Sequence, residues 1–266
     1  MPRLYIPDIL ISDSKILITG DRVRYLMSVL RCKKGDELVI FDGKGNCYRA
    51  TILKTGRKEV VTKVTDTFSC NTESPLDIIL IQCLLKGDKM DLVIQKTTEL
   101  GVKEIIPAVS ERSQLRETRK LIRWIKVAEE ASRQSGRSVI PVIHEPVGIR
   151  NIINTYSSKE KMYGFIFYEE GGVRLSEAMQ QKRMQDARFR LHDKGTNKIT
   201  QKHELQHAST PVHIVIGPEG GFTKDEIAFA KEAGLIVASF GERIMRAETA
   251  AISAVTLVQF LLGDMS

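Results

Sequence analysis

The sequence predicts an α/β protein made of two parts, a small N-terminal β-barrel and a larger C-terminal domain built on a parallel sheet. Three observations predict this. The first 70 residues contain short β-rich segments separated by turn signals. From Leu76 onward, strand patterns alternate with helix patterns, which is typical of parallel sheets covered by helices. Two glycine-bearing loops, GPEGG and FGERIM, each follow a strand pattern and precede a helix pattern.

The predicted N-terminal domain spans residues 1–70, and the polar segment 69–75 links it to a domain at 76–266. The β-rich segments are KILITG, ELVIFDGKGNCYRATI and EVVTKVTD, with glycine-containing turns between them. A helix is expected between the first two, because its apolar residues recur at helical spacing: Val23, Leu26, Met27 and Leu30. Small barrels of this kind often carry RNA-binding loops.

The predicted C-terminal domain begins with LDIILIQCLL, an almost continuous apolar strand of the kind that is buried on both faces. A helix follows, with Asp88 as its N-cap and Gly101 at its C-terminal end. Further strands are expected in VKEIIPAVS, VIPVIHEP, KMYGFIFYEE, VHIVIG and LIVASFG. Further helices are expected in TRKLIRWIKVAEEASRQSGR, after GPEGGF, and in AETAAISAVTLVQFLL.

Composition and charge narrow the class of protein. The chain has 266 residues, 42% hydrophobic and 27% charged, as in ordinary globular proteins. No apolar run reaches the ~18 residues that span a membrane, and the N-terminal residues resemble no secretory signal. Residues 1–70 hold 13 Lys and Arg against 8 Asp and Glu, so most of the net charge of +7 lies there. This excess favours a polyanionic partner, and the alternative is a solvated basic surface.

The cysteines and histidines point to neither a metal nor a disulfide framework. Cys32, Cys47, Cys70 and Cys83 are scattered and form no C-x-x-C pair, which favours a reducing cytoplasm. Three histidines lie in the polar, weakly periodic segment 179–210, which we interpret as part helix and part insertion: His192, His203 and His207. No acidic or thiol ligands stand at regular spacing beside them, so we expect no metal site.

The GPEGG turn predicts a ligand site. Thr223 and Glu226 form a capping box, so a helix begins directly after Phe222 and the turn lies at the C-terminal edge of the sheet. Ligands of open α/β sheets bind at that edge, and glycines let a ligand approach the backbone. The turn matches neither nucleotide-binding glycine motif, which argues against ATP and NAD. The alternative is a plain strand-to-helix connection.

The second loop, FGERIMRAETA, occupies the equivalent place after the next strand. Gly241 opens it, and Arg243 and Arg246 flank two apolar residues. Because both loops follow strands of one sheet, we expect them to form a single pocket. The alternative is that both arginines cap the helix or form surface ion pairs.

These two motifs together resemble the ribosomal small-subunit methyltransferase E family. These are SPOUT-class enzymes that methylate the imino nitrogen N3 of a uridine in small-subunit (16S) ribosomal RNA. The similarity covers nearly the whole chain, including RVRYLMSVLRCKKGDELVIFDGKG, KGDKMDLVIQKTTELGV and RWIKVAEEASRQSGRSVIP. The sequence departs from the family at Tyr25, where histidine is usual, and at Phe240 and Met245, where leucines are common.

The resemblance implies a SPOUT α/β domain with a deep trefoil knot, and an N-terminal PUA-like barrel that binds RNA. It also implies that S-adenosylmethionine is held in the knot, largely by the backbone of three loops. The corresponding cofactor-binding residues are Tyr168, Glu169, Ile216, Gly217, Pro218, Glu219, Gly220, Gly221, Phe240, Gly241, Arg243, Ile244 and Met245. Knotted domains of this family pair as homodimers, and the apolar character of AETAAISAVTLVQFLL agrees with a homodimer.

Methyl transfer from a sulfonium is an in-line displacement that requires no metal, so the protein chiefly aligns the reactants. The uridine imino group is protonated at neutral pH, so its proton must leave or the anion on the ring oxygens must be stabilised. Arg246 is the first candidate for electrostatic stabilisation, with Arg112 next, and Glu248 is a candidate base whose alternative role is a helix cap. The candidate RNA-binding residues of the barrel are Arg3, Arg22, Arg24, Arg31, Lys33 and Lys34.

Two other functions compete with methylation of small-subunit ribosomal RNA. One is a SPOUT enzyme that acts on transfer RNA or on another base, and the other is an RNA-binding protein without catalysis. The glycine loops argue against the second, because a protein that only binds RNA needs no cofactor pocket.

Overall fold

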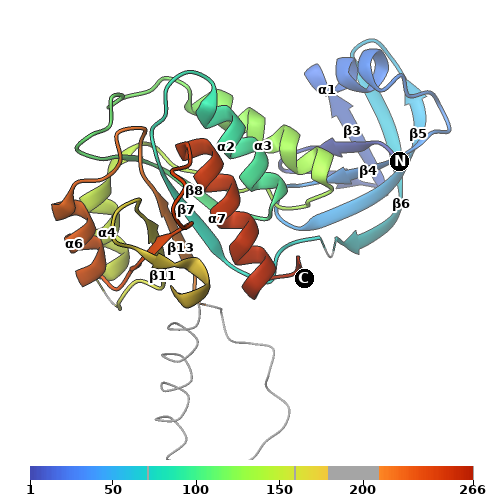
Figure 1. The fold of residues 1–266 in the computed structure, drawn as a ribbon. Coiled ribbons are helices and arrows are strands. Elements are labelled where there is room, and N and C mark those ends of the chain that lie inside the picture. The colour runs from blue at the N-terminus through green and yellow to red at the C-terminus, as the bar shows by residue number, and fades with distance from the viewer. Residues whose placement is uncertain (71, 159, 179–209, 266) are drawn as a thin grey trace, which may run out of the picture. The chain divides into compact units, whose positions relative to one another are not determined.

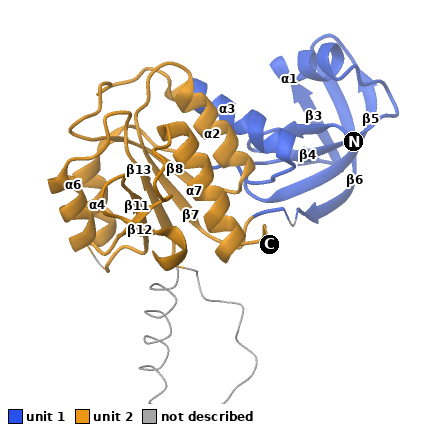
Figure 2. Cartoon of the chain, viewed as in Figure 1, with its two compact units in different colours: residues 1–73, 123–141 blue, residues 74–122, 142–266 orange. Residues whose placement is uncertain are grey.

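The computed structural model describes residues 1–70, 72–158, 160–178 and 210–265. The chain forms two compact units (Figure 1, Figure 2). Unit 1 contains Met1–Glu73 and Arg123–Pro141, and unit 2 contains Ser74–Ile122 and Val142–Ser266. The predicted polar segment 179–210 lies, except for residue 210, outside the described residues.

Unit 1 is built on a six-stranded sheet of order β1-β4-β5-β6-β3-β2. Strands β1 and β4 pair in parallel, and the other neighbours are antiparallel. The strands are β1 (Arg3–Tyr5), β2 (Ile11–Ser12), β3 (Lys15–Thr19), β4 (Glu37–Phe41), β5 (Asn46–Thr55) and β6 (Glu59–Ser69). Alternating side chains of these strands, such as Ile16, Ile18 and Val60, bury one apolar face in a common core. All three predicted β-rich segments are therefore confirmed.

The predicted helix of unit 1 has an irregular form. It begins as α1 (Asp21–Arg24) and continues as a π-helical turn, η1 (Tyr25–Val29). The backbone N–H of Leu30 donates to the carbonyl oxygen of Tyr25, five residues earlier, at 3.0 Å. Leu26 within this turn is fully buried in the core, so the predicted apolar face is confirmed although the winding differs.

One pair of cysteines departs from the expectation that the cysteines form no disulfide framework. Cys47 and Cys70 are bonded to each other, whereas Cys32 and Cys83 are free and buried. The separation of 23 residues between Cys47 and Cys70 matches no recognisable cysteine motif. The antiparallel register brings them together, because Cys47 pairs with Phe68 and Cys70 follows directly after β6.

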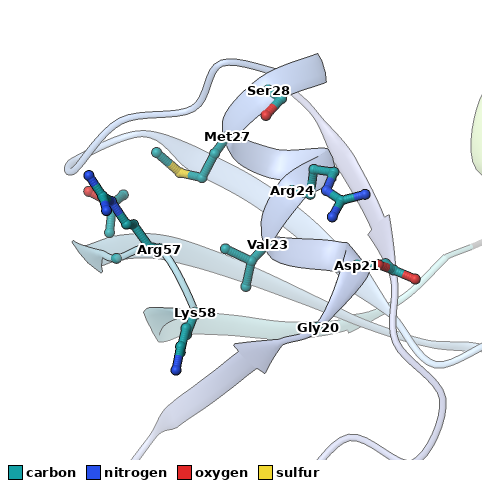
Figure 3. A pocket seen from close by; sticks show the side chains of 10 residues that line it. Gly20, Asp21, Val23, Arg24, Met27, Ser28, Arg57 and Lys58 are labelled. Carbon is teal, nitrogen blue, oxygen red and sulfur yellow. The ribbon is translucent and has the colours of Figure 1, made fainter.

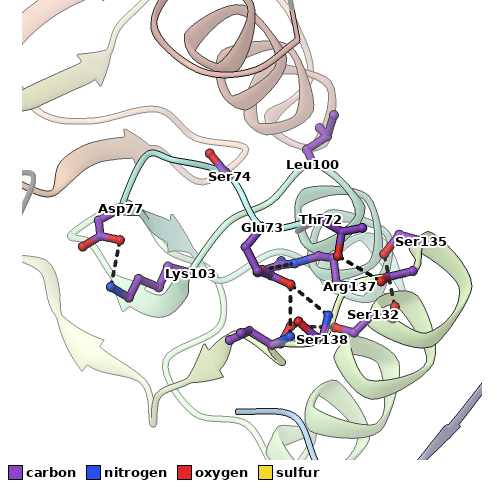
Figure 4. Close-up of polar contacts among 12 residues, drawn as sticks. Thr72, Glu73, Ser74, Asp77, Leu100, Lys103, Ser132, Ser135, Arg137 and Ser138 are labelled. Atoms are coloured by element: carbon purple, nitrogen blue, oxygen red, sulfur yellow. Dashed lines mark hydrogen bonds and ion pairs between the residues drawn. The ribbon is translucent and has the colours of Figure 1, made fainter. Parts of the chain in front are cut away.

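The compact units differ from the predicted domains in one segment, because residues 123–141 belong to unit 1 whereas the predicted C-terminal domain spans residues 76–266. The helix α3 (Leu121–Ser135) lies mostly in this segment and buries Trp124. The Glu73 carboxylate binds the segment that follows α3 (Figure 4). It accepts hydrogen bonds from the Arg137 guanidinium at 2.8 and 3.0 Å and from the backbone N–H groups of Ser138 and Val139 at 2.9 and 3.0 Å.

Replacing Glu73 by alanine is expected to destabilise the protein by about 3 kcal/mol, because it leaves the buried Arg137 guanidinium without its carboxylate. The free energy of unfolding can be measured in urea from the fluorescence of Trp124, which is the single tryptophan of the chain. Asp77→Ala is the matched control, because the Asp77–Lys103 pair is exposed and should contribute less than about 1 kcal/mol. Equal losses for the two variants would contradict a special role of Glu73.

Unit 2 is built on an eight-stranded sheet with the path β10-β8-β7-β13-β11-β14-β12, to which β9 adds beside β8. All of its recorded strand pairs are parallel. The strands are β7 (Ile78–Cys83), β8 (Glu104–Val109), β9 (Val142–Ile143), β10 (Val147–Gly148), β11 (Gly164–Phe167), β12 (Val173–Arg174), β13 (Val212–Ile216) and β14 (Ile236–Ser239). The predicted parallel sheet is therefore confirmed, and β7, β11 and β13 are buried along their whole lengths.

The helices of unit 2 that lie wholly within its described residues are α2 (Lys89–Glu99), α4 (Ile149–Ser157), α6 (Lys224–Glu232) and α7 (Ala247–Leu262). Asp88 stands at the N-cap of α2 but makes no capping hydrogen bond with its side chain, and Gly101 follows α2 with a φ of +87°. Helix α4 was not predicted, although Ile149, Ile152 and Ile153 are buried at helical spacing. The helices α2 and α7 contact each other (Figure 1).

Candidate active site

The two glycine-bearing loops line one pocket of about 400 Å³ in unit 2. The first loop follows β13, and the second connects β14 to α7, so both lie at the carboxyl ends of parallel strands. The pocket is lined by Lys89, Phe167, Glu169, Ile216, Gly217, Pro218, Glu219, Gly221, Phe222, Ile244, Met245, Arg246, Ala247 and Ala250. The predicted single pocket is present in the structure.

The GPEGG turn is tightly constrained at Gly221. Its backbone N–H donates to the carbonyl oxygen of Pro218 at 3.0 Å, and its φ is +67°, a value that side chains disfavour. A Cβ atom at this position would lie 2.5 Å from Oε1 of Glu169. Glycine at 221 therefore allows the turn and the Glu169 carboxylate to lie side by side at the pocket.

The helix after this turn begins where the capping box predicted. The Thr223 hydroxyl accepts from the backbone N–H of Glu226, and the Glu226 carboxylate accepts from the backbone N–H of Thr223. The same carboxylate, which is buried, also accepts from the backbone N–H of Glu111 at 2.8 Å. Glu226 thus ties the start of α6 to the loop after β8, which carries Arg112.

Lys89 joins two carboxylates beside the pocket. Its ammonium lies 3.0 Å from Oε1 of Glu219 and 3.8 Å from Oε2 of Glu248. Burial raises the pKa of Glu219, but hydrogen bonds from its own backbone N–H, from the Lys89 ammonium and from the backbone N–H of Lys86 outweigh this, so its pKa lies below the usual range. Glu219 is therefore held as a carboxylate in the wall of the pocket.

The second loop presents both apolar and charged groups. Phe240 stacks on Phe167, which lines the pocket, with ring centroids 4.5 Å apart. Ile244 is 83% exposed although it lines the pocket, which leaves a large apolar side chain next to the cavity. Arg246 stands at the N-cap of α7, and among the described residues its guanidinium has neither a capping hydrogen bond nor an ion pair. This guanidinium is available to a ligand.

The three catalytic candidates differ in their surroundings. Arg246 lines the pocket, whereas Arg112 and Glu248 do not. Arg112 is exposed, and its Nη1 lies 3.4 Å from the carbonyl oxygen of Gly220, next to the GPEGG turn. The Glu248 side chain is 13% exposed, lies in the first turn of α7 and faces Lys89, and its buried Oε2 accepts no hydrogen bond from the described residues.

Most of the predicted cofactor-binding residues line the pocket. Those that do are Glu169, Ile216, Gly217, Pro218, Glu219, Gly221, Ile244 and Met245, and those that do not are Tyr168, Gly220, Phe240, Gly241 and Arg243. Residues missed from the sequence are Lys89, Phe167, Phe222, Ala247 and Ala250. The four apolar ones adjoin the predicted loops, but Lys89 is 130 residues from Glu219 and gave no local signal.

The predicted RNA-binding residues of unit 1 fall into two groups. Arg3 donates to the backbone of Arg137 at 3.0 Å, and Arg22 donates to the backbone of Tyr5 at 2.9 Å. Both arginines are half-buried, and each of these hydrogen bonds lies within unit 1. The others are exposed: Arg24, Arg31, Lys33 and Lys34. Arg31 has a φ of +53°, which is unusual for a side-chain-bearing residue.

Neither a metal centre nor a membrane span is found in the described part of the chain. Within it, no three His, Cys, Asp or Glu side chains gather in a way that could hold a metal ion. His192, His203 and His207 lie outside the described residues. No helix in the same part combines the length and the apolar character needed to cross a membrane.

Comparisons with known proteins agree on one family. The family profile of the RNA methyltransferase domain matches residues 72–182 and 170–259, and that of the RNA methyltransferase PUA domain matches residues 18–65. A Buchnera aphidicola (subsp. Acyrthosiphon pisum) protein named Ribosomal RNA small subunit methyltransferase E is 31% identical, over 99% of this chain and 95% of that protein. The protein of the same name from Bacillus subtilis is 27% identical, over 93% of this chain and 92% of its own.

The fold has a close match among solved structures. The structure of a Ribosomal RNA small subunit methyltransferase E from Neisseria gonorrhoeae, bound to S-adenosyl methionine, superposes with a TM-score of 0.82 at 30% identity. The match covers 100% of both chains. The expected PUA-like and α/β domains are confirmed by these comparisons.

Proposed function

This chain belongs to the ribosomal RNA small subunit methyltransferase E family, and from that premise we propose that it transfers a methyl group from S-adenosylmethionine to N3 of a uridine in small-subunit (16S) ribosomal RNA. The observation that carries this proposal is the single pocket between the two glycine-bearing loops, beside which the guanidinium of Arg246 has no partner among the described residues. The deep trefoil knot that the resemblance implies stays a prediction for this chain.

The residues of the pocket fit S-adenosylmethionine. A volume of about 400 Å³ lies within the range of ~300–1,000 Å³ that is usual for cofactor sites. Apolar side chains such as Phe167 and Phe222 suit a flat adenine ring, and the carboxylates of Glu169 and Glu219 suit the hydroxyl and cationic groups of the cofactor. The glycines leave backbone groups open to it. When bound, the cofactor supplies an electrophilic methyl group on a positively charged sulfur.

The protein's own groups then act on the uridine. Arg246 binds the ring oxygens next to N3 and stabilises the negative charge that develops as the imino proton leaves. Arg112 is the second positively charged group near the GPEGG turn, because its guanidinium lies at the carbonyl oxygen of Gly220. Glu248 is assigned to the ion pair with Lys89 rather than to proton removal, because it is mostly buried and does not line the pocket. The proton at N3 therefore passes to solvent in this proposal.

The test is methyl transfer to a defined substrate. Unmethylated small-subunit particles are incubated with the protein and labelled S-adenosylmethionine, and the modified nucleotide is mapped in the ribosomal RNA. We expect a single N3-methyluridine in the small-subunit RNA. Label in transfer RNA instead would support a SPOUT enzyme with another substrate, and cofactor binding without any transfer would support a non-catalytic RNA-binding protein.

We further propose that the protein is a homodimer and that its partner subunit helps to complete the active site. Exposed apolar side chains on the two contacting helices support this: Leu92 on α2, and Leu257 and Phe260 on α7. Phe260 is 53% exposed, which is unusual for a phenylalanine outside an interface. A cytoplasmic location is proposed as well, since the proposed substrate is found there.

Replacing both Leu257 and Phe260 by aspartate is expected to convert the dimer to a monomer and to abolish methyl transfer. The physical reason is that a desolvated carboxylate in an apolar interface has no partner. Size-exclusion chromatography with light scattering measures the mass at micromolar concentration. The control is Val142→Asp, which changes another exposed apolar side chain of unit 2 and should leave the mass unchanged. A wild-type protein that is already monomeric would refute the proposal.

A further inference from the structure

Unit 1 contains a groove of about 810 Å³ whose walls are formed by two segments far apart in the sequence. One wall is α1 with the π-helical turn η1, and the other is the turn between β5 and β6 (Figure 3). The lining residues are Gly20, Asp21, Val23, Arg24, Met27, Ser28, Thr55, Gly56, Arg57 and Lys58. Among them only Arg24 belongs to the RNA-binding residues predicted from the sequence.

The charge of the groove is positive and uncompensated. Arg24, Arg57 and Lys58 are exposed, and among the described residues none of them forms an ion pair or a side-chain hydrogen bond. Asp21 is the one acidic residue of the lining. Cations that are held close together in a groove repel one another. A polyanion that enters the groove removes this repulsion. The charge therefore matches a chain of phosphates.

The shape of the groove depends on its two walls. The backbone N–H of Gly56 donates to the carbonyl oxygen of Glu59 at 2.9 Å, which closes the turn and places the neighbours Arg57 and Lys58 at its tip. On the wall formed by α1 and η1, the buried side chain of Val23 and the half-buried side chain of Met27 give the groove an apolar base. An apolar floor below cationic walls suits a nucleotide, whose ribose and base are less polar than its phosphate.

The π-helical turn is a second, independent feature of the same wall. Met27 and Ser28 both belong to this turn and line the groove. Single π-helical turns cost regular hydrogen bonding and are found preferentially at functional sites. The turn therefore supports a functional role for this wall.

We propose that this groove binds the phosphate backbone of the substrate RNA, with Arg24, Arg57 and Lys58 on the phosphates and Met27 under an adjacent nucleotide. This inference rests on the proposed function, and it assigns the RNA contact to the groove rather than to the basic surface as a whole. Arg57 and Lys58 are contacts that the sequence did not reveal.

The experiment compares two pairs of substitutions in the full-length protein. The first is Arg57→Ala with Lys58→Ala, and the matched control is Lys15→Ala with Lys63→Ala, which removes the same charge from exposed, paired positions on β3 and β6 outside the groove. The affinity for deproteinised, unmethylated small-subunit RNA is measured at several salt concentrations. Loss of two phosphate contacts should lower the slope of log K against log salt by about 1.4–1.8, or roughly 30-fold in affinity at ~0.1 M salt.

A third variant tests whether charge is what matters. Exchanging the two residues, Arg57→Lys with Lys58→Arg, should keep the wild-type slope, because both side chains still reach phosphates. S-adenosylmethionine affinity should be unchanged in all variants. Equal slopes for the groove pair and the control pair would overturn the proposal. So would weaker binding to intact particles without weaker binding to the naked RNA, because the groove would then hold a ribosomal protein.

The outcome for the groove can be separated from the outcome for the proposed function. Failure of the wild-type protein to methylate particles would remove the proposed function. Normal methylation by the wild type, together with normal RNA affinity of the groove pair, would remove only the groove.

Discussion

Replacement of Arg246 by alanine is expected to lower the single-turnover rate of methyl transfer about 100- to 1,000-fold, which is the usual loss when a preorganised electrostatic donor is removed. The guanidinium lines the pocket and has no partner in the described part of the protein, so no structural contact is lost with it. Cofactor affinity and the mass of the protein should stay unchanged. Arg246→Lys should recover only part of the rate, because an ammonium lacks the planar fork of the guanidinium.

The matched control for Arg246 is Arg174→Ala, which removes an exposed arginine of unit 2 from β12, outside the pocket. The rate is measured with labelled cofactor and unmethylated particles, with the enzyme in excess. A nearly normal rate for Arg246→Ala would move the electrostatic role to Arg112, whose alanine variant should then show the loss.

Replacement of Gly221 by valine is expected to weaken S-adenosylmethionine binding at least 100-fold, equivalent to roughly 2.7 kcal/mol. The φ of +67° at this position disfavours a β-branched residue, so the turn must shift, and a Cβ atom there would also lie 2.5 Å from Oε1 of Glu169 and displace that carboxylate at the pocket. Gly220 is not among the glycines with a positive φ, and the nearest atom to a Cβ there would be the carbonyl oxygen of Arg112 at 3.2 Å, so Gly220→Val should have a smaller effect.

Calorimetry measures the affinity, and a thermal melt shows whether the variant folds. Valine at 221 is also strained by the φ of +67°, so the control must carry a similar strain without blocking the pocket. Gly136→Val meets this condition, because its φ is +84° and nothing lies within 4 Å of the position of its Cβ. Unchanged affinity in Gly221→Val would mean that the cofactor does not occupy this pocket.

The elements around the site could be predicted from the sequence because their signals are local. The apolar run of β13, the Thr223–Glu226 capping box and the apolar residues of α7 each identify an element without knowledge of the rest of the fold. The pocket followed from chain order, since loops after parallel strands share one edge of the sheet. The unit to which α3 belongs could not be predicted in the same way. The sequence of an amphipathic helix does not show against which of two hydrophobic cores its apolar face packs.

The contacts that were missed depend on long-range pairing. Lys89 reaches Glu219 across 130 residues, and Glu73 reaches Arg137 across 64. Cys47 and Cys70 meet through the register of β5 and β6. Likewise, Arg57 and Lys58 form one groove with Arg24 only because the β5–β6 turn folds opposite α1. None of these pairs has a characteristic spacing in the sequence.

Because residues 123–141 belong to unit 1, the order in which the two units can be completed during synthesis on the ribosome is affected. A nascent chain can complete a unit only after every segment of that unit has emerged, and N-terminal domains usually fold first. Here the buried Arg137 and Trp124 emerge only after β7, α2 and β8 of unit 2 have been made. The Glu73 carboxylate therefore lacks its Arg137 partner while the translating ribosome produces residues 74–122 of the following unit.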